Sequence, residues 1–132
     1  MLVVDASATV EMLLGTSLGS VVAERIFGPL ETLHVPELLD LEVAQVLRRY
    51  ERARLLDRAR AEAALADLAD LPFERYSHRL LLPRAWELRG HLTLYDAVYV
   101  ALAELLDAPL LTGDAALASA RHRATIELLA LP

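Results

Sequence analysis

Short apolar runs alternate along this chain with longer segments in which apolar residues recur every three or four positions. Five runs have the length and composition of buried strands: residues 2–4, 33–35, 73–76, 109–112 and 126–129. Helical spacing predicts helices in the segments between most of these runs: residues 17–27, 37–55, 57–71, 79–89, 94–107 and 115–123. Strands that alternate with helices predict an α/β fold, with a parallel sheet covered on both faces.

Proline and glycine mark the boundaries of two of these helices. The pair Gly28-Pro29 ends the helix over 17–27. Proline lacks the backbone N–H that a helix interior needs, so we expect Pro83 close to the first turn of the helix over 79–89.

With 132 residues, the chain has the size of one domain, and we predict a single domain over residues 1–132. A hydrophobic fraction of 55% excludes disorder, and the absence of cysteine excludes a disulfide scaffold, a zinc finger and thiol catalysis. The longest wholly apolar run, 97–103, is far shorter than the roughly 20 residues of a membrane span. The first residues lack the basic start of a signal peptide. We therefore expect a cytoplasmic protein without a membrane segment.

All 13 basic residues are arginine, and the absence of lysine excludes or disfavours several classes of phosphate-handling protein. A Walker A loop needs its lysine, so a nucleotide triphosphatase of that type is excluded. A phosphohydrolase with Asp5 as its nucleophile is disfavoured for the same reason, and because Ser7 stands where its second acid would be. Because arginine replaces lysine throughout and the net charge is −6, arginine content alone is weak evidence for nucleic-acid binding.

Two aspartates follow strands that the topology places at one edge of the sheet. Asp5 closes the first predicted strand, and Asp114 follows the fourth. In open parallel sheets, ligands bind beyond the carboxyl ends of the strands, near the point where strand order reverses. Each acid also has a purely structural interpretation: Asp5 as a turn residue, and Asp114 as the cap of the helix over 115–123.

Further acids lie on the predicted helices. Asp96 follows Thr93 by three residues, which matches a capping box, and this local role is compatible with a role in a site. Asp40 and Glu42 lie on opposite sides of the apolar stripe of the helix over 37–55. Helical spacing alone does not decide which of these two points inward.

In combination, these segments resemble the PIN-domain nucleases, and among them the VapC-type toxins of bacterial toxin–antitoxin pairs. The matching segments follow one another along nearly the whole chain: Val4-Asp5-Ala6-Ser7, Pro36-Glu37-Leu38-Leu39, Glu42-Val43-Ala44, Val46-Leu47-Arg48-Arg49, residues 94–103 and Leu110-Leu111-Thr112-Gly113-Asp114. The most specific parts are the Tyr-Asp-Ala segment within 94–103 and the Thr-Gly-Asp segment. The chain departs from the pattern at Gln45, where many relatives carry asparagine.

The resemblance implies a three-layer α/β/α PIN-like fold, with a five-stranded parallel sheet in the order 3-2-1-4-5. It also implies that four acids form the catalytic and metal-binding site, and it selects Glu42 rather than Asp40: Asp5, Glu42, Asp96 and Asp114. Two carboxylates about 4 Å apart repel by roughly 4 kcal/mol at an effective dielectric near 20, so such a group needs a cation or extra protons. Oxygen ligands favour Mg²⁺ or Mn²⁺ over zinc.

We therefore expect metal-dependent attack of water on an RNA phosphate, with the three aspartates as main ligands. Glu42 is expected to bind a second ion or to orient water. The hydroxyls of Ser7 and Thr112 stand beside the acids in sequence and could hold a water or the phosphate. The structural alternative for both hydroxyls is a local turn or cap hydrogen bond.

The resemblance further implies an RNA substrate, an antitoxin protein that occupies the groove of the site, and a homodimer. Arg48 and Arg49 begin a basic stretch that is either a solvated face or an RNA-phosphate contact. Three aromatic residues on predicted helices are expected to pack in the core rather than to stack on bases: Trp86, Tyr95 and Tyr99.

Two other functions stay open: a catalytically weak binding module with the PIN fold, and a housekeeping PIN ribonuclease outside any toxin–antitoxin pair. The presence of all four acids argues against loss of catalysis. A neighbouring gene for a small protein with a DNA-binding N-terminus would favour the toxin.

Overall fold

A five-stranded parallel sheet forms the centre of the protein, in a computed structural model that describes residues 1–28 and 30–132. The strands are β1 (Leu2–Val4), β2 (Leu33–Pro36), β3 (Phe73–Tyr76), β4 (Leu110–Thr112) and β5 (Ile126–Leu128). Their order is β3-β2-β1-β4-β5, and each neighbouring pair is parallel, which confirms the predicted sheet. Strand order therefore reverses between β1 and β4.

The described helices are α1 (Ala6–Leu13), α2 (Ser17–Ile26), α3 (Leu38–Arg52), α4 (Arg58–Asp70), α5 (His78–Glu87), α6 (Leu94–Leu106) and α7 (Ala115–Ser119). Helical spacing predicted all of them except α1. Asp5 directly follows β1 and caps α1, so no turn separates this strand from its helix. With only eight residues, α1 is too short to show a clear helical period.

Some predicted helix boundaries are wrong. Pro83 is the sixth residue of α5 and so lies beyond its first turn. The missing N–H deprives the carbonyl of Arg79 of its helical partner, but both residues are exposed and water can bind there. The helix α3 ends at Arg52 rather than 55, where the chain turns through Arg54 with a φ of 58°. Pro29, expected to end the second helix, lies outside the described residues.

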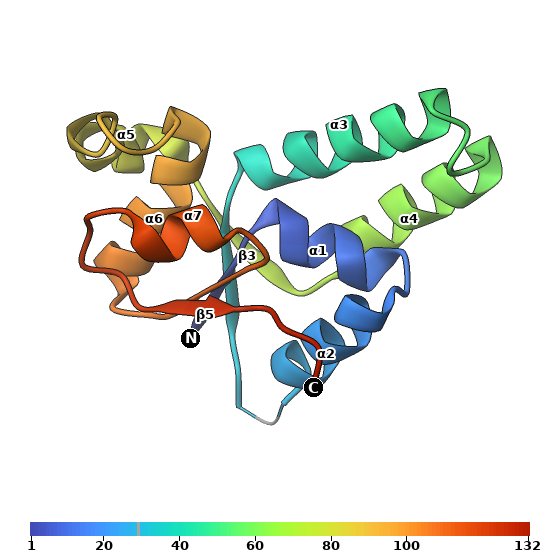
Figure 1. The fold of residues 1–132 in the computed structure, drawn as a ribbon, viewed down its shortest axis with the longest axis horizontal. Helices are drawn as coiled ribbons and strands as arrows, with labels where there is room; N and C mark the ends of the chain where they lie inside the picture. Colours follow the sequence, from blue (N-terminus) through green and yellow to red (C-terminus); the bar gives the residue numbers. More distant parts are fainter. Residues whose placement is uncertain (29) are drawn as a thin grey trace.

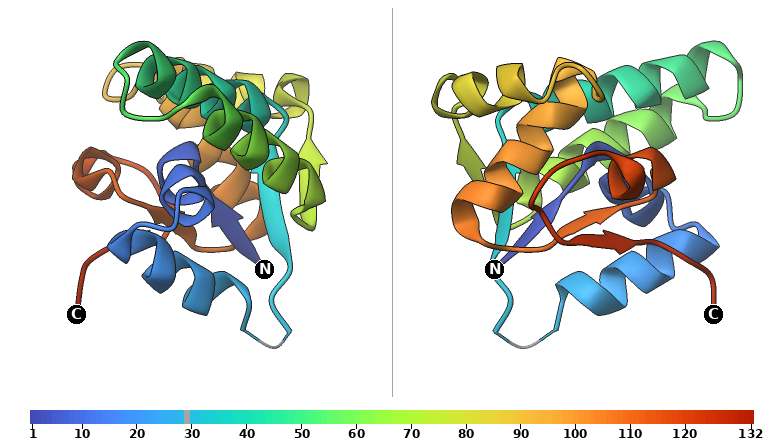
Figure 2. Two further views of the ribbon diagram at one scale, coloured as in Figure 1. Left: turned by 90° about the vertical axis from the view of Figure 1, so that its right-hand side faces the viewer. Right: turned by 60° about the vertical axis from the view of Figure 1, so that its left-hand side comes forward.

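The helices form two layers, one on each face of the sheet (Figures 1 and 2). On one face, α6 packs against β1, β2 and β4, and α5 packs on α6. On the other face, α1 packs against β4 and also contacts α2, α3 and α4. The helices α3 and α4 form a hairpin that extends beyond the sheet (Figure 1, teal and green). This arrangement confirms a sheet covered on both faces.

The centre of the sheet and α6 form the most deeply buried part of the protein. Each residue of β1 is 0% exposed, and residues 97–103 of α6 are all buried. The apolar run in α6 has no polar face because this helix lies between the sheet and α5. None of the described helices is by itself long and apolar enough to cross a membrane; α1 and α2 reach that length and hydropathy only together, across a bend of 109°.

Candidate active site at the carboxyl edge of the sheet

Asp5 lies directly after β1 and is almost completely buried, with 6% of its surface exposed. Its Oδ1 accepts hydrogen bonds from the Ser7 hydroxyl at 2.7 Å and the Ala8 N–H at 2.9 Å, and its Oδ2 accepts from the Thr112 hydroxyl. The Ala8 bond makes Asp5 the N-cap of α1, so its local structural role is real. Burial raises the pKa of Asp5 more than these donors lower it, so the pKa lies above its usual range.

Ser7 and Thr112 join the end of β1 to the turn after β4. The Thr112 hydroxyl is fully buried and accepts a hydrogen bond from the Asp114 N–H at 3.0 Å while it donates to Asp5. The Ser7 hydroxyl accepts from the Gly113 N–H at 3.0 Å while it also donates to Asp5. These hydroxyls therefore orient one carboxylate and attach the turn that carries a second one.

Asp114 and Asp96 lie at the starts of two helices. Asp114 is exposed and caps α7, where its Oδ1 accepts from the Ala116 N–H at 2.9 Å. Asp96 is half-buried in the first turn of α6, where its N–H donates to the Thr93 hydroxyl at 3.2 Å. Burial raises the pKa of Asp96 most, and the nearby charges of Asp114 and Asp5 raise it further.

Glu42 is the acid that α3 contributes. It is half-buried, and the Tyr99 hydroxyl of α6 donates to its Oε1 at 2.7 Å. Burial raises the pKa of Glu42, and the charges of Asp96 and Asp5 add to this effect, although the Tyr99 hydrogen bond opposes it. The hydrogen bond from Tyr99 shows that Glu42 faces α6, the helix that also carries Asp96.

Asp40, the alternative on α3, lies apart from this group. Its two carboxylate oxygens accept hydrogen bonds from the Arg75 guanidinium, at 2.6 and 2.8 Å. An arginine of β3 therefore neutralises Asp40, whereas Glu42 is bound by a neutral phenol.

We call Asp5, Glu42, Asp96 and Asp114 the acidic site. Burial is the main cause of the raised pKa at three of them, and mutual repulsion contributes in each case. Among the described residues, no three His, Asp or Glu side chains are close enough to form an assembled metal-binding group. The acids thus form a loose group. Their chemistry nevertheless fits a hard divalent cation, because every donor is oxygen and positive charge would relieve the repulsion.

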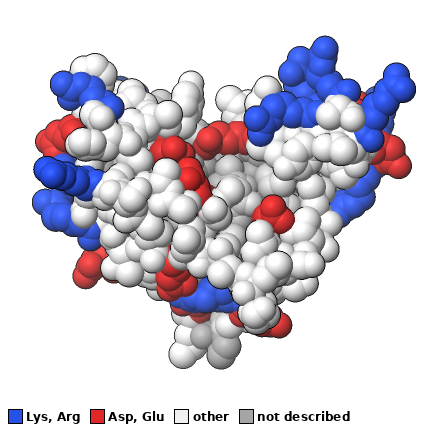
Figure 3. Space-filling model, in the orientation of Figure 1, with Lys and Arg blue, Asp and Glu red and all other residues white. Residues whose placement is uncertain are grey.

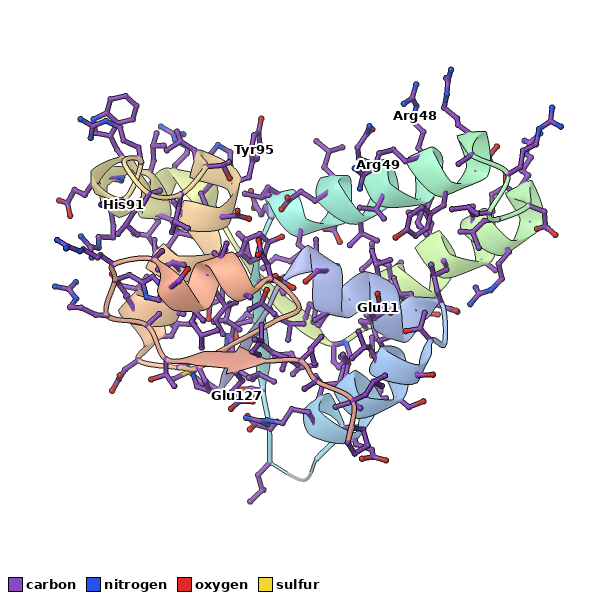
Figure 4. The ribbon with its side chains drawn as sticks, in the orientation of Figure 1. Glu11, Arg48, Arg49, His91, Tyr95 and Glu127 are labelled. Atoms are coloured by element: carbon purple, nitrogen blue, oxygen red, sulfur yellow. The ribbon has the colours of Figure 1, made fainter. Side chains whose placement is uncertain are left out.

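A groove of about 590 Å³ runs along α3 beside Glu42. Leu41 lies in its wall and is 76% exposed, and Gln45 also lines it. Tyr95, at the start of α6, lies across from α3 (Figure 4). The lining residues are Ala6, Leu38, Leu41, Glu42, Ala44, Gln45, Val46, Arg48, Arg49 and Tyr95. The groove is therefore mainly apolar, with one acid of the acidic site and two arginines in its wall.

The sequence model of the PIN-domain family matches residues 2–123 of this chain. This chain belongs to the PIN-domain family. It is 40% identical to Ribonuclease VapC12 of Mycobacterium tuberculosis over 131 aligned residues. The alignment covers 98% of this chain and 100% of that protein. It is 43% identical over 119 residues to Ribonuclease VapC1 of the same organism, or 89% of each protein. The structure of VapBC2 from Rickettsia felis, bound to a DNA fragment from their promoter, has a TM-score of 0.73 at 12% identity, over 98% of each chain.

One face of this PIN domain has an acidic hollow with basic side chains beyond it. Acidic side chains gather in the hollow between α5 and the α3–α4 hairpin, whereas basic side chains lie on the outer ends of both (Figure 3). Arg48 and Arg49 are exposed and project from α3 away from the sheet (Figure 4). Positive charge therefore borders the negative hollow.

Of the three aromatic residues predicted to pack in the core, two are exposed and one is buried. Trp86 is 55% exposed, with the Arg89 guanidinium 4.3 Å from its ring centroid, and Tyr95 is 66% exposed. These two predictions of core packing are wrong, because α5 forms the outer layer and only one side of the α6 N-terminus is covered. Tyr99 is 2% exposed, as predicted. Its hydrogen bond to Glu42 was not predicted, although its position three residues after Asp96 places both side chains on one helix face.

Proposed function

We propose that this PIN-domain protein is an endoribonuclease that requires Mg²⁺ or Mn²⁺, and that it is the toxin of a type II toxin–antitoxin pair. The observation that carries the proposal is the acidic site. Its carboxylates belong to separate parts of the chain and lie near the place where strand order reverses, between β1 and β4. Among the described residues, none of them takes part in an ion pair. The similarity to Ribonuclease VapC12 over the whole of that protein supports a ribonuclease.

The acids divide into two roles in this proposal. Asp5, Asp96 and Asp114 are the main metal ligands, and Glu42 binds a second ion or orients water. A bound Mg²⁺ or Mn²⁺ supplies positive charge that polarises the phosphodiester and makes water a stronger nucleophile. The half-burial of Glu42 and Asp96 strengthens their attraction for a cation, because less water screens their charge.

Other residues of the chain prepare the site for substrate. Ser7 and Thr112 hold both oxygens of the Asp5 carboxylate in one orientation and tie the turn of Asp114 to β1. Arg48 and Arg49 are proposed to contact RNA phosphates next to the groove. The path from these arginines to Glu42 follows the face of α3 that lines the groove.

The proposal is tested by incubating the purified chain with a mixed RNA pool in Mg²⁺, in Mn²⁺ and in excess EDTA. We expect cleavage with either ion and none with EDTA. Asp96→Asn should reduce the rate by about 100-fold or more, because it removes a charge that the reaction centre needs. Asp67→Asn, on the exposed face of α4, is the matched control and should cleave normally.

Cleavage that survives both EDTA and Asp96→Asn would contradict the proposed chemistry. A folded wild-type chain that binds RNA but cleaves none would favour the catalytically weak binding module instead. Growth arrest on expression, absent in Asp96→Asn, would separate a toxin from a housekeeping ribonuclease.

We propose that the antitoxin occupies the groove beside Glu42. The exposed Leu41 supplies apolar surface, and the acidic site supplies negative charge that no ion pair between described residues neutralises. A segment with apolar side chains and one basic side chain would complement both features. The similarity to VapBC2 of Rickettsia felis supports a fold that suits such a complex. A homodimer, a cytoplasmic location and a single domain over residues 1–132 stay predictions.

A further inference from the structure

A hydrogen bond from the hydrophobic core reaches into the acidic site. Tyr99 of α6 is 2% exposed, and its hydroxyl donates to Glu42 Oε1 at 2.7 Å although the two residues are 57 positions apart. We propose that Tyr99 is a positioning residue that holds the Glu42 carboxylate of α3 in a set place relative to Asp96 of α6. This inference rests on the proposed function, because it assigns a task to an acid of that site.

Glu42 needs such a restraint more than Asp5 and Asp114 do. Asp5 and Asp114 have short side chains that accept hydrogen bonds from backbone N–H groups of the helices they cap. Glu42 has a longer side chain with an additional torsion, and it belongs to the hairpin that extends beyond the sheet. In the described part of the chain, the Tyr99 hydroxyl is its one hydrogen-bond donor.

The position of Tyr99 suits this task. Asp96 and Tyr99 are three residues apart on α6 and therefore lie on one helix face. The buried ring of Tyr99 packs within the core, so its hydroxyl has little freedom to move. A phenol donates a single hydrogen bond and carries no charge, so it orients one carboxylate oxygen without neutralising the group. An arginine at this place would instead compete with a cation.

The test compares two tyrosine variants in their binding of Mn²⁺ alone, measured by calorimetry on the metal-free chain. Tyr99→Phe removes only the hydroxyl that contacts Glu42. Tyr76→Phe is the matched control, because it removes a hydroxyl that contacts His34 Nδ1 at the same distance of 2.7 Å. We expect Tyr99→Phe to weaken Mn²⁺ binding by roughly 10-fold, as is typical when a partner of a metal ligand is lost. Tyr76→Phe should bind Mn²⁺ as the wild type does.

A double-mutant cycle with Glu42→Gln separates positioning from a general effect on the fold. If Tyr99 acts through Glu42, the double variant should bind Mn²⁺ as Glu42→Gln does, because the carboxylate that Tyr99 orients is already gone. Losses that multiply in the double variant overturn the proposal, and so does a folded Tyr99→Phe with wild-type affinity. Wild-type chain that binds no Mn²⁺ overturns the proposed metal site itself, which is a different outcome.

A second measurement covers the case in which Tyr99→Phe does not fold. In the wild-type chain, the hydroxyl proton of Tyr99 should be protected from solvent exchange and visible by NMR, with a nuclear Overhauser contact to the Glu42 side chain. A hydroxyl proton that exchanges freely at neutral pH overturns the contact and the proposal with it.

Discussion

Two glutamates at α6, Glu104 and Glu42, have opposite kinds of partner and opposite pKa shifts. Glu104, in the last turns of α6, has a side chain only 4% exposed and pairs with Arg84 at 2.7 Å and Arg123 at 3.5 Å. Burial raises the pKa of Glu104, but the Arg84 and Arg123 N–H donors outweigh it, so the pKa lies below its usual range. Among the described residues, the one hydrogen-bond donor to Glu42 is the Tyr99 phenol, and the pKa of Glu42 lies above that range.

The comparison separates two uses of a carboxylate. The fold itself neutralises Glu104, which ties α6 to α5 and to the segment before β5. The fold does not neutralise Glu42 and the rest of the acidic site. This costs stability, because like charges share a partly buried space. A group of charges that the fold does not neutralise is a candidate binding site for a ligand of opposite charge.

The largest expected difference concerns stability after removal of each charge. Glu104→Gln leaves Arg84 without its buried partner and should lower the free energy of unfolding by about 3 kcal/mol. Glu42→Gln should leave it unchanged or raise it, since it removes repulsion. Urea unfolding of the metal-free chain measures both, with Glu87→Gln as the control for an exposed partner of Arg84. Equal destabilisation by both glutamine variants would remove the distinction.

A smaller effect is expected from two surface arginines that make no ion pair with the described part of the chain. Arg48 and Arg49 are exposed, in contrast to Arg84, and their joint replacement by Glu should weaken RNA binding by about 10-fold at low salt. The salt dependence should also become less steep by about one unit per lost phosphate contact. The double replacement of Arg79 and Arg121 by Glu changes the net charge equally and is the control. Equal losses in both double variants would show a long-range effect of net charge only.

The smallest effect is the pH dependence of stability in the metal-free chain. The folded pKa values of Asp5, Glu42 and Asp96 are raised, first by burial and then by mutual repulsion. Their charged forms therefore destabilise the fold at neutral pH, and this cost disappears as the pH falls through those values. The folded pKa of Glu104 is lowered, so its contribution is present above the ordinary value of 4.5 and is lost as the pH falls through the folded value. Stability should therefore pass through a maximum in mildly acidic solution.

Thermal unfolding between about pH 7 and 3 measures this maximum as a rise in stability on its neutral side, followed by a loss at lower pH. Asp96→Asn should flatten that rise and leave the loss at lower pH unchanged. Saturating Mn²⁺ at neutral pH should have the same flattening effect, because the cation replaces the protons. A steady fall in stability from pH 7 downwards would contradict the assignment of the raised pKa values.

Much of the fold was predictable because its signals are local. The strand runs and the helical period placed the five strands and six of the seven described helices, and the resemblance supplied the sheet order. The exception, α1, follows β1 without a turn and is capped by Asp5, the residue directly after the strand. The acids Asp5 and Asp114 were predictable as neighbours, because parallel strands bring their carboxyl ends to one edge.

The sequence by itself determined the order of elements and the presence of oxygen-donor side chains at the sheet edge, because periodicity, caps and strand ends are properties of neighbouring residues. Only the tertiary structure decided which of these charges are neutralised. Arg75 from β3 reaches Asp40, Arg84 from α5 reaches Glu104, and Glu42 receives the Tyr99 hydroxyl. Such pairings join residues from different elements, so they depend on how helices pack on the sheet.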